Sequence, residues 1–231
     1  MKEFFSDQPS FPPVLGFDGH LYLFISLLLV VVGSIKYYEN KKWQLTFKSL
    51  QVLQLVLLYG WYLAVREPIS EALPLYHCRM AMFVLLLAPD KSPYKEYFSL
   101  LGVFGSICAL IYPIFDPFSG FHVTIFSFIF GHLALLGNAM NYLMRLHDYQ
   151  LNLGKIAQLT FGINSFILLV DIVTGADYGF LRNLPLLGNF GLFWNYLIES
   201  VLFTLILTAF LKIFQAVQLS RQQENKQYER G

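Results

Sequence analysis

Seven apolar stretches separated by short polar connections run along the 231-residue chain. Each is close to the length that a helix needs to cross about 30 Å of hydrocarbon, at about 1.5 Å per residue. The third stretch is the shortest. As a helix it would extend only about 22 Å, so we expect its beginning to lie below the membrane surface. The predicted spans are residues 19–37, 46–65, 74–88, 97–115, 121–144, 155–174 and 191–216. The pattern predicts an all-α fold, a polytopic transmembrane bundle of seven helices.

The basic residues are distributed unevenly between alternate connections. Twelve of the 16 lysines and arginines fall on the side that carries the polar end of the chain, and only Lys2, Arg66 and Arg182 fall on the other side, with Arg79 inside a stretch. Cytoplasmic connections carry the excess of Lys and Arg, so the N-terminus is predicted outside and the C-terminus in the cytoplasm. Residues 1–216 then form a single seven-helix transmembrane domain, followed by a cytoplasmic polar tail over residues 217–231.

The composition agrees with a multi-pass protein of the cell membrane. Hydrophobic residues make up 56% of the chain and charged residues 13%, whereas soluble domains have about 25% charged residues. The net charge is +1, and the basic residues lie between apolar segments rather than in one patch, so we expect no nucleic-acid partner. The chain has no HExxH or CxxC spacing, and we expect no metal and no cofactor. Of the two cysteines, Cys108 is predicted to be a small core residue.

One cluster of polar groups opens the third stretch, in the run Leu73-Pro74-Leu75-Tyr76-His77-Cys78-Arg79. Ionisable groups inside a bilayer are rare and usually face a partner or a water-filled cavity, so this run is the main candidate for a functional site. Pro74 suits the first turn of a helix. Cys78 would then lie one turn inside an N-terminus, where the helix dipole and unpaired N–H groups favour a thiolate.

Other polar groups fall at matching depths of later stretches. His132 lies near the bilayer centre, Asp171 shares a helix face with Asn164 in the outer half of the sixth stretch, and Glu199 lies in the outer half of the last. We expect one cavity, open to the outer side, to be lined by His20, His77, Cys78, Arg79, His132, Asp171 and Glu199. Two plainer alternatives remain. His20 is an interfacial imidazole, or Arg79 forms a structural ion pair with Asp171 or Glu199.

The order of these features resembles the YwaF-like family of bacterial integral membrane proteins and its eukaryotic relative, transmembrane protein 164. The family's Leu-Pro-Leu-His-Leu-Cys type motif is matched by Leu73-Pro74-Leu75 and Cys78, its mid-span histidine by Phe130-Gly131-His132, and its loop before the last span by residues 174–181. The motif histidine falls on Tyr76 here, and the imidazole is moved one place to His77, which is about 100° around a helix.

The resemblance implies a seven-helix bundle and, for the eukaryotic relative, a fatty acyltransferase that acts on phospholipids through a cysteine and a histidine, here Cys78 and His132. It also adds Tyr178, in the matching loop, to the substrate-binding candidates. The expected function is a membrane-embedded lipid acyltransferase or transacylase that acts on a phospholipid or other acyl lipid. The alternative is a non-enzymatic membrane protein that binds or transports a lipid or small molecule in a polar outer-leaflet pocket. Neither the acyl donor nor the oligomeric state follows from the sequence.

Overall fold

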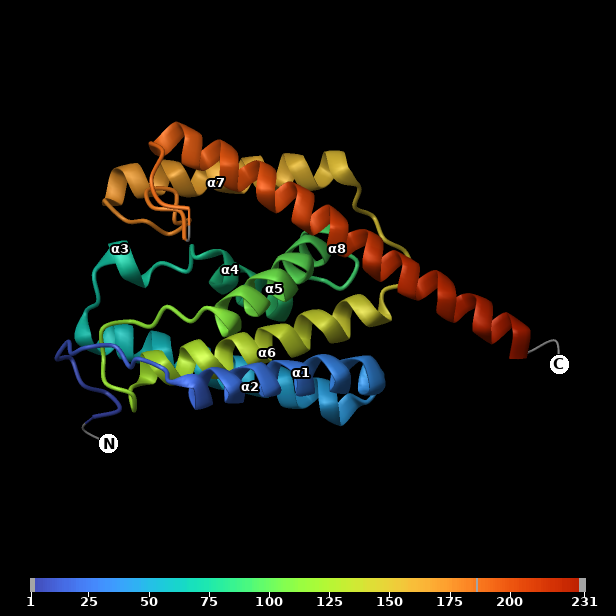
Figure 1. The fold of residues 1–231 in the computed structure, drawn as a ribbon, viewed down its shortest axis with the longest axis horizontal. Helices are drawn as coiled ribbons and strands as arrows, with labels where there is room; N and C mark the ends of the chain where they lie inside the picture. Colours follow the sequence, from blue (N-terminus) through green and yellow to red (C-terminus); the bar gives the residue numbers. More distant parts are fainter. Residues whose placement is uncertain (1–2, 186, 229–231) are drawn as a thin grey trace.

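The computed structural model describes residues 3–185 and 187–228, without the side chains of residues 224–228. The regular secondary structure of the described residues is helical, apart from an isolated β-bridge between Leu184 and Gly188. Its elements, shown in Figure 1, are α1 (Phe17–Tyr37), α2 (Lys41–Val65), α3 (Ile69–Ala72), α4 (His77–Leu87), α5 (Pro93–Ile111), α6 (Val123–Arg145), α7 (Leu153–Thr174) and α8 (Leu192–Tyr228). Six of these described helices, all except α3 and α4, are long and apolar enough to cross a membrane. The predicted all-α, multi-pass character is confirmed.

The third predicted stretch forms a shorter helix than expected. Helix α4 has 11 residues and begins at His77, so Pro74 precedes the helix and Cys78 is its second residue. The prediction that Pro74 opens the helix is therefore wrong. A residue before proline is pushed toward extended conformations, and Leu73 has ψ 144°. Tyr76 is also extended, with ψ 133°, so helical geometry starts only after it.

Other helix ends also differ from the predicted spans, for example the start of α2 at Lys41 and the end of α5 at Ile111. Helix α5 begins at Pro93, because the Ser92 side chain accepts the Tyr94 N–H and a proline suits the first helical position. The predicted start at Tyr97 left Lys95 in the connection before the helix. In the structure Lys95 lies in the first turn of α5, where it is buried and its ammonium donates to the Asp90 carboxylate at 2.7 Å. At the other end of the chain, α8 continues past residue 216 as far as Tyr228.

Helix α4 and its extended flanks connect the two ends of the bundle (Figure 1). At its start, the Arg79 guanidinium donates to the Tyr62 hydroxyl, near the end of α2, at 2.6 Å. Beyond its end, the Asp90 carbonyl accepts from the Tyr142 hydroxyl, near the end of α6, at 2.6 Å. The chain therefore runs from one end of the bundle to the other between α2 and α5, although α4 itself is short.

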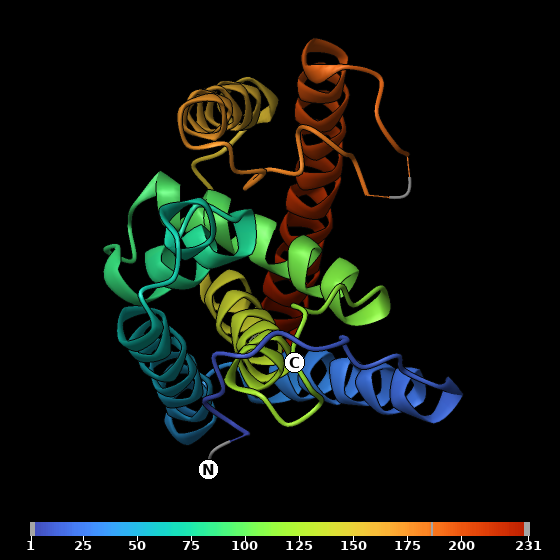
Figure 2. The same cartoon turned by 90° about the vertical axis from the view of Figure 1, so that its left-hand side faces the viewer.

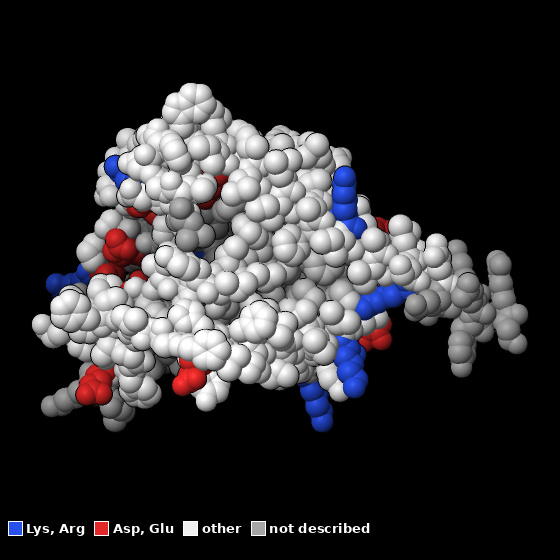
Figure 3. Space-filling view, in the orientation of Figure 1, with Lys and Arg blue, Asp and Glu red and all other residues white. Residues whose placement is uncertain are grey.

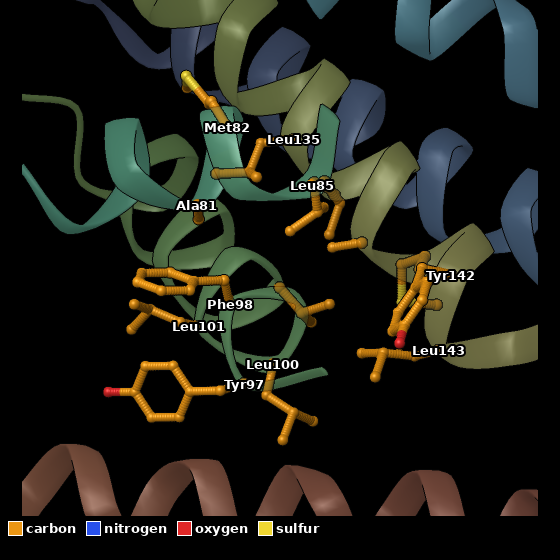
Figure 4. Close-up of a cluster of buried hydrophobic side chains, with 14 of the residues drawn as sticks. Ala81, Met82, Leu85, Tyr97, Phe98, Leu100, Leu101, Leu135, Tyr142 and Leu143 are labelled. Carbon is orange, nitrogen blue, oxygen red and sulfur yellow. The ribbon is translucent and has the colours of Figure 1, made fainter. Parts of the chain in front are cut away.

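The core is centred on α6, which packs against α1, α2 and α5. Figure 4 shows part of it, where α4, α5 and α6 interdigitate through Leu85, Leu101 and Leu135. Gly137 allows the close approach of α2, because a Cβ there would lie 2.4 Å from the Phe47 ring. Cys108, predicted to be a core residue, is exposed on α5. Both the core and the lipid are apolar, so hydrophobicity alone does not distinguish a core position from a lipid-facing one.

Helices α7 and α8 form a pair beside the other helices (Figure 2). Helix α7 packs mainly against α8 and touches α3, while α8 also packs against α5 and α6. Helix α7 is attached to the main bundle by apolar side chains such as Ile156 and Ile167 and by individual polar side chains, several of which lie at the candidate site.

Candidate functional site

The three polar residues at the start of α4 face three different neighbours. Successive residues on a helix are about 100° apart. His77 reaches α7 and α8, Cys78 lies against α5, and Arg79 reaches α2 and the end of α3. The cluster that is continuous in sequence is therefore divided in space.

His77 belongs to a buried network that joins three helices. The Asn164 amide on α7 donates to the Ser200 hydroxyl on α8 at 3.0 Å. The amide oxygen of Asn164 is then the acceptor for the His77 Nε2–H, at 2.8 Å. The other ring nitrogen, Nδ1, lies 3.8 Å from the Glu199 carboxylate. Since a neutral imidazole has one donor and one acceptor, Nδ1 is then the acceptor, and it approaches the carboxylate without forming a hydrogen bond to it.

Glu199 is 5% exposed, and its second oxygen, Oε2, is buried without a hydrogen-bond partner among the described residues. The predicted alternative ion pair between Arg79 and Asp171 or Glu199 is not formed, because in the described part of the chain neither carboxylate lies within 4.0 Å of the guanidinium. Glu199 instead faces His77. A carboxylate buried away from water is costly unless it is paired, and the His77 ring is the basic group within 4.0 Å of Glu199 in the described structure.

Cys78 lies at the uncapped beginning of α4. Its side chain is partly exposed and faces Gly105 of α5, where an added Cβ would lie 2.6 Å from the sulfur. No side chain caps the helix, and the first backbone bond runs from the Met80 N–H to the Tyr76 carbonyl. The N–H groups of residues 77–79 therefore have no acceptor within the helix, and Cys78 lies in this first turn.

Arg79 is held between aromatic rings. Its guanidinium lies 5.2 Å from the centre of the Tyr62 ring and 5.0 Å from that of Tyr76. It also donates to the Glu71 carbonyl at 3.3 Å. In the connection after α5, burial raises the pKa of Asp116 while the nearby Arg79 charge opposes that rise. The cation is therefore stabilised by ring faces and neutral oxygens, without a carboxylate in direct contact within the described structure.

His132 is buried on α6, and its Nδ1 donates to the Phe128 carbonyl one turn earlier at 2.6 Å. This bond fixes the tautomer, so that Nε2 of the neutral ring is an acceptor. No hydrogen bond joins His132 to Cys78, both of which the structure describes. The preceding residue, Gly131, faces α4, because a Cβ there would lie 3.2 Å from the end of Met82.

The remaining predicted residues lie in two other places. Asp171 accepts the Tyr178 N–H at 3.0 Å, and the Tyr178 hydroxyl bonds the Ile69 carbonyl and accepts the Leu73 N–H at 3.0 Å. Tyr178 is fully buried, so it fastens the loop before α8 to the segment before α4. His20 is exposed on α1, where its Nδ1 bonds the Gly16 carbonyl at 3.0 Å.

The structure thus brings His77 together with Glu199, and Asp171 together with Tyr178. Helical period predicted that Asn164 shares a face with Asp171. It did not predict that Ser200, Tyr62 and Gly105 contact the candidate residues. Ser200 is next to Glu199 in the sequence, yet nothing local indicates that it would meet Asn164. Among the described residues, no group of three or more His, Cys, Asp or Glu side chains could hold a metal ion.

Charge is segregated along the molecule. Figure 3 shows most acidic side chains of this face toward the end that carries the start of α1, and most basic side chains toward the end of α8. The same view shows a hollow between the α7–α8 pair and the rest of the bundle at the acidic end. Two cavities, of about 450 Å³ beside the N-terminal segment and about 500 Å³ at the basic end, are lined by residues other than the eight site candidates.

The sequence model of the TMEM164 family matches residues 10–214. The chain belongs to the TMEM164 family. The matched region contains α1 to α7, the first two thirds of α8 and every residue of the candidate site. TMEM164 proteins are membrane proteins, in agreement with the six long apolar helices. No curated protein and no solved structure matches the chain.

Proposed function

We propose that this TMEM164-family protein is a membrane-embedded lipid acyltransferase or transacylase in which Cys78 is the nucleophile. The observation that carries the proposal is the place of Cys78, a partly exposed residue, at the second position of an uncapped 11-residue helix. Unpaired N–H groups at a helix N-terminus stabilise a thiolate, and the same groups can stabilise the oxyanion that forms when a thiolate attacks an ester.

The reaction has two half-steps. The Cys78 thiolate attacks the acyl carbonyl of a lipid ester, a C–S bond forms, and the ester C–O bond breaks. The departing alkoxide takes the proton that the thiol had given to a base. An acceptor hydroxyl then gives its proton to the same base and attacks the thioester, which restores the thiol. If the acceptor is water, the outcome is hydrolysis.

His132 is our candidate for the base. Its Nδ1 is committed to the Phe128 carbonyl, which leaves Nε2 to accept a proton. Helices α4 and α6 are in contact, and the adjacent Gly131 faces α4. The Arg79 cation is suited to hold the lipid phosphate, since it has no direct carboxylate partner within the described residues. In this proposal His77 and Glu199 hold α4 against α7 and α8. Asp171 and Tyr178 hold the loop before α8 in place.

The test is acyl transfer measured by mass spectrometry on the purified full chain in lipid nanodiscs. We expect Cys78→Ala to abolish transfer and His132→Ala to slow it by about 100-fold to 10,000-fold. The matched control is Cys108→Ser, since Cys108 is an exposed thiol on α5. It should leave the rate unchanged. Trapping an acyl thioester on Cys78 would support the mechanism, and full activity of Cys78→Ala would refute it.

A second candidate function is lipid or small-molecule binding and transport without chemistry. It is favoured by the contact of the Cys78 sulfur with Gly105, because a cysteine that only fills space between two helices would make the same contact. In that case a lipid ligand would bind equally well to the Cys78→Ser variant, and no acyl product would form with any substrate.

We further propose that the chain crosses the cell membrane seven times, with the N-terminus outside. The route of α4 between the two ends of the bundle and the concentration of basic residues at one end support this topology. Single cysteines introduced at Lys41, Lys91 and Tyr149 should be labelled only from the cytoplasm, and those at Asp116 and Asn183 only from outside. Labelling of Lys41 and Lys91 from opposite sides would show that α4 does not complete a crossing.

A further inference from the structure

A cavity of about 500 Å³ lies at the basic end of the bundle, away from the Cys78 site. It is enclosed by the turn between α1 and α2, the end of α6, the connection to α7, and α8. Its volume is within the range of about 300 to 1,000 Å³ that is usual for small-molecule sites. The cavity takes no part in the proposed acyl transfer.

The charged side chains that line this cavity are mostly cationic. Lys41, Arg145 and Arg221 line it, together with His147, and among the lining residues that the structure describes Glu39 is the one carboxylate. Across the described structure, no carboxylate lies within 4.0 Å of any of the three cations. The described lining of the cavity therefore carries an excess of positive charge, and its cations make no direct ion pair with a described carboxylate.

The two guanidinium groups are positioned by neutral partners. Arg221 lies over the Tyr38 ring, 4.5 Å from its centre, and donates to the Met144 carbonyl at 3.4 Å. Arg145 donates its Nε–H to the Asn141 carbonyl at 3.0 Å. Carbonyl and ring partners orient these side chains without neutralising them, and the terminal nitrogens of Arg145 keep their donors for another acceptor. Guanidinium groups arranged in this way match the oxygens of a phosphate.

We propose that this cavity binds the phosphate of an anionic phospholipid headgroup from the leaflet at the basic end. The lining combines the cations with apolar side chains of α8, Phe214 and Val217, of which Val217 is exposed. A headgroup phosphate can contact the cations while its acyl chains lie along α8 in the hydrocarbon. Basic pockets between transmembrane helices on the cytoplasmic side are suited to such headgroups, because that leaflet carries the anionic lipids.

The experiment measures lipid binding to the detergent-purified full chain by native mass spectrometry. Phosphatidylglycerol and phosphatidylcholine of the same acyl composition are titrated separately. We expect phosphatidylglycerol to bind as a one-to-one complex, at least tenfold more tightly than phosphatidylcholine. Arg145→Gln and Arg221→Gln should each weaken its binding roughly 10-fold to 100-fold, the effect of losing a charge-assisted hydrogen bond.

The matched control is Lys212→Gln, which removes one positive charge from an exposed position of α8 outside the cavity. It should leave binding unchanged. Arg221→Lys keeps the charge but not the planar donor pair, and we expect it to bind more weakly than the unaltered chain. Melting temperatures in detergent alone identify any variant that fails to fold. If a variant does not fold, the site is tested instead by competition between phosphatidylglycerol and glycerol 3-phosphate on the unaltered protein.

Competition separates a lipid from a soluble phosphate. If glycerol 3-phosphate at millimolar concentration displaces phosphatidylglycerol completely, the site takes soluble phosphate esters and the lipid assignment is wrong. Failure to displace the lipid supports it. Equal affinity for the two phospholipids, or equal weakening by Lys212→Gln and Arg221→Gln, would overturn the proposal.

Discussion

The bridge made by Asn164 leads to a quantitative prediction. Asn164 connects His77 on α4 to Ser200 on α8, and Asn164 and Ser200 are 1% and 0% exposed. Asn164→Leu keeps the branching and the number of heavy atoms of the side chain but removes both hydrogen bonds. Because the two bonds join α4 to both α7 and α8, we expect the variant to loosen the attachment of the α7–α8 pair to α4.

The magnitude follows from the two bonds of 2.8 and 3.0 Å. Hydrogen bonds between helices in a membrane contribute about 0.6 kcal/mol on average and up to about 1.7 kcal/mol. Asn164→Leu should therefore lower the free energy of unfolding by about 1 to 3.5 kcal/mol. Ser200→Ala removes one bond and should cost about 0.5 to 2 kcal/mol. In the double variant the losses should not add, and the coupling energy should be about 0.6 to 1.7 kcal/mol.

The assay is unfolding of the purified protein in mixed micelles with a rising fraction of SDS. It is applied to both single variants, the double variant and Gln158→Leu. The last is the matched control, because it removes an exposed amide from the same helix α7. It should stay within about 0.5 kcal/mol of the unaltered chain. A coupling energy near zero between Asn164→Leu and Ser200→Ala would refute the bridge, as would equal effects of Asn164→Leu and Gln158→Leu.

Two further outcomes can be measured on the same preparation. Gly137→Ala should destabilise the protein by about 1 to 3 kcal/mol, because its Cβ would lie 2.4 Å from the Phe47 ring. Gly60→Ala, with no atom within 4 Å of the added Cβ, should be neutral or stabilising, and equal losses would contradict this packing argument. Burial lowers the pKa of His122, whose Nε2 bonds the Ser6 carbonyl at 2.9 Å. As the pH falls below about 6.5, the unfolded chain binds a proton that the folded chain resists, so stability should decrease. The amide protection factors of residues 3–10, corrected for the intrinsic pH dependence of exchange, should then decrease between pH 7.5 and 5, and unchanged protection factors would show that His122 does not hold this segment.

The existence and class of the helices followed from the sequence alone. A backbone in hydrocarbon must satisfy its own hydrogen bonds, so a long apolar run can be predicted as a helix without knowledge of its neighbours. Helix ends depended on local signals of unequal strength. Helix α5 begins at Pro93 because Ser92 caps it, although the charged Lys95 follows within the first turn. The Lys95 charge is tolerated in a buried position because it bonds Asp90.

The candidate site was only partly visible in the sequence. The run that ends in His77, Cys78 and Arg79 identified the right segment, and helical period placed Asn164 and Asp171 on one face. Period defines which residues share a face but not which helix lies opposite it. The sequence therefore determined the apolar helices and the polar cluster of this protein. Tertiary structure alone decided that His77 meets Asn164 and Glu199, that Cys78 meets Gly105, and that Cys108 is exposed. These outcomes depend on how helices pack, and in a membrane a helix face toward lipid is as apolar as one toward the core.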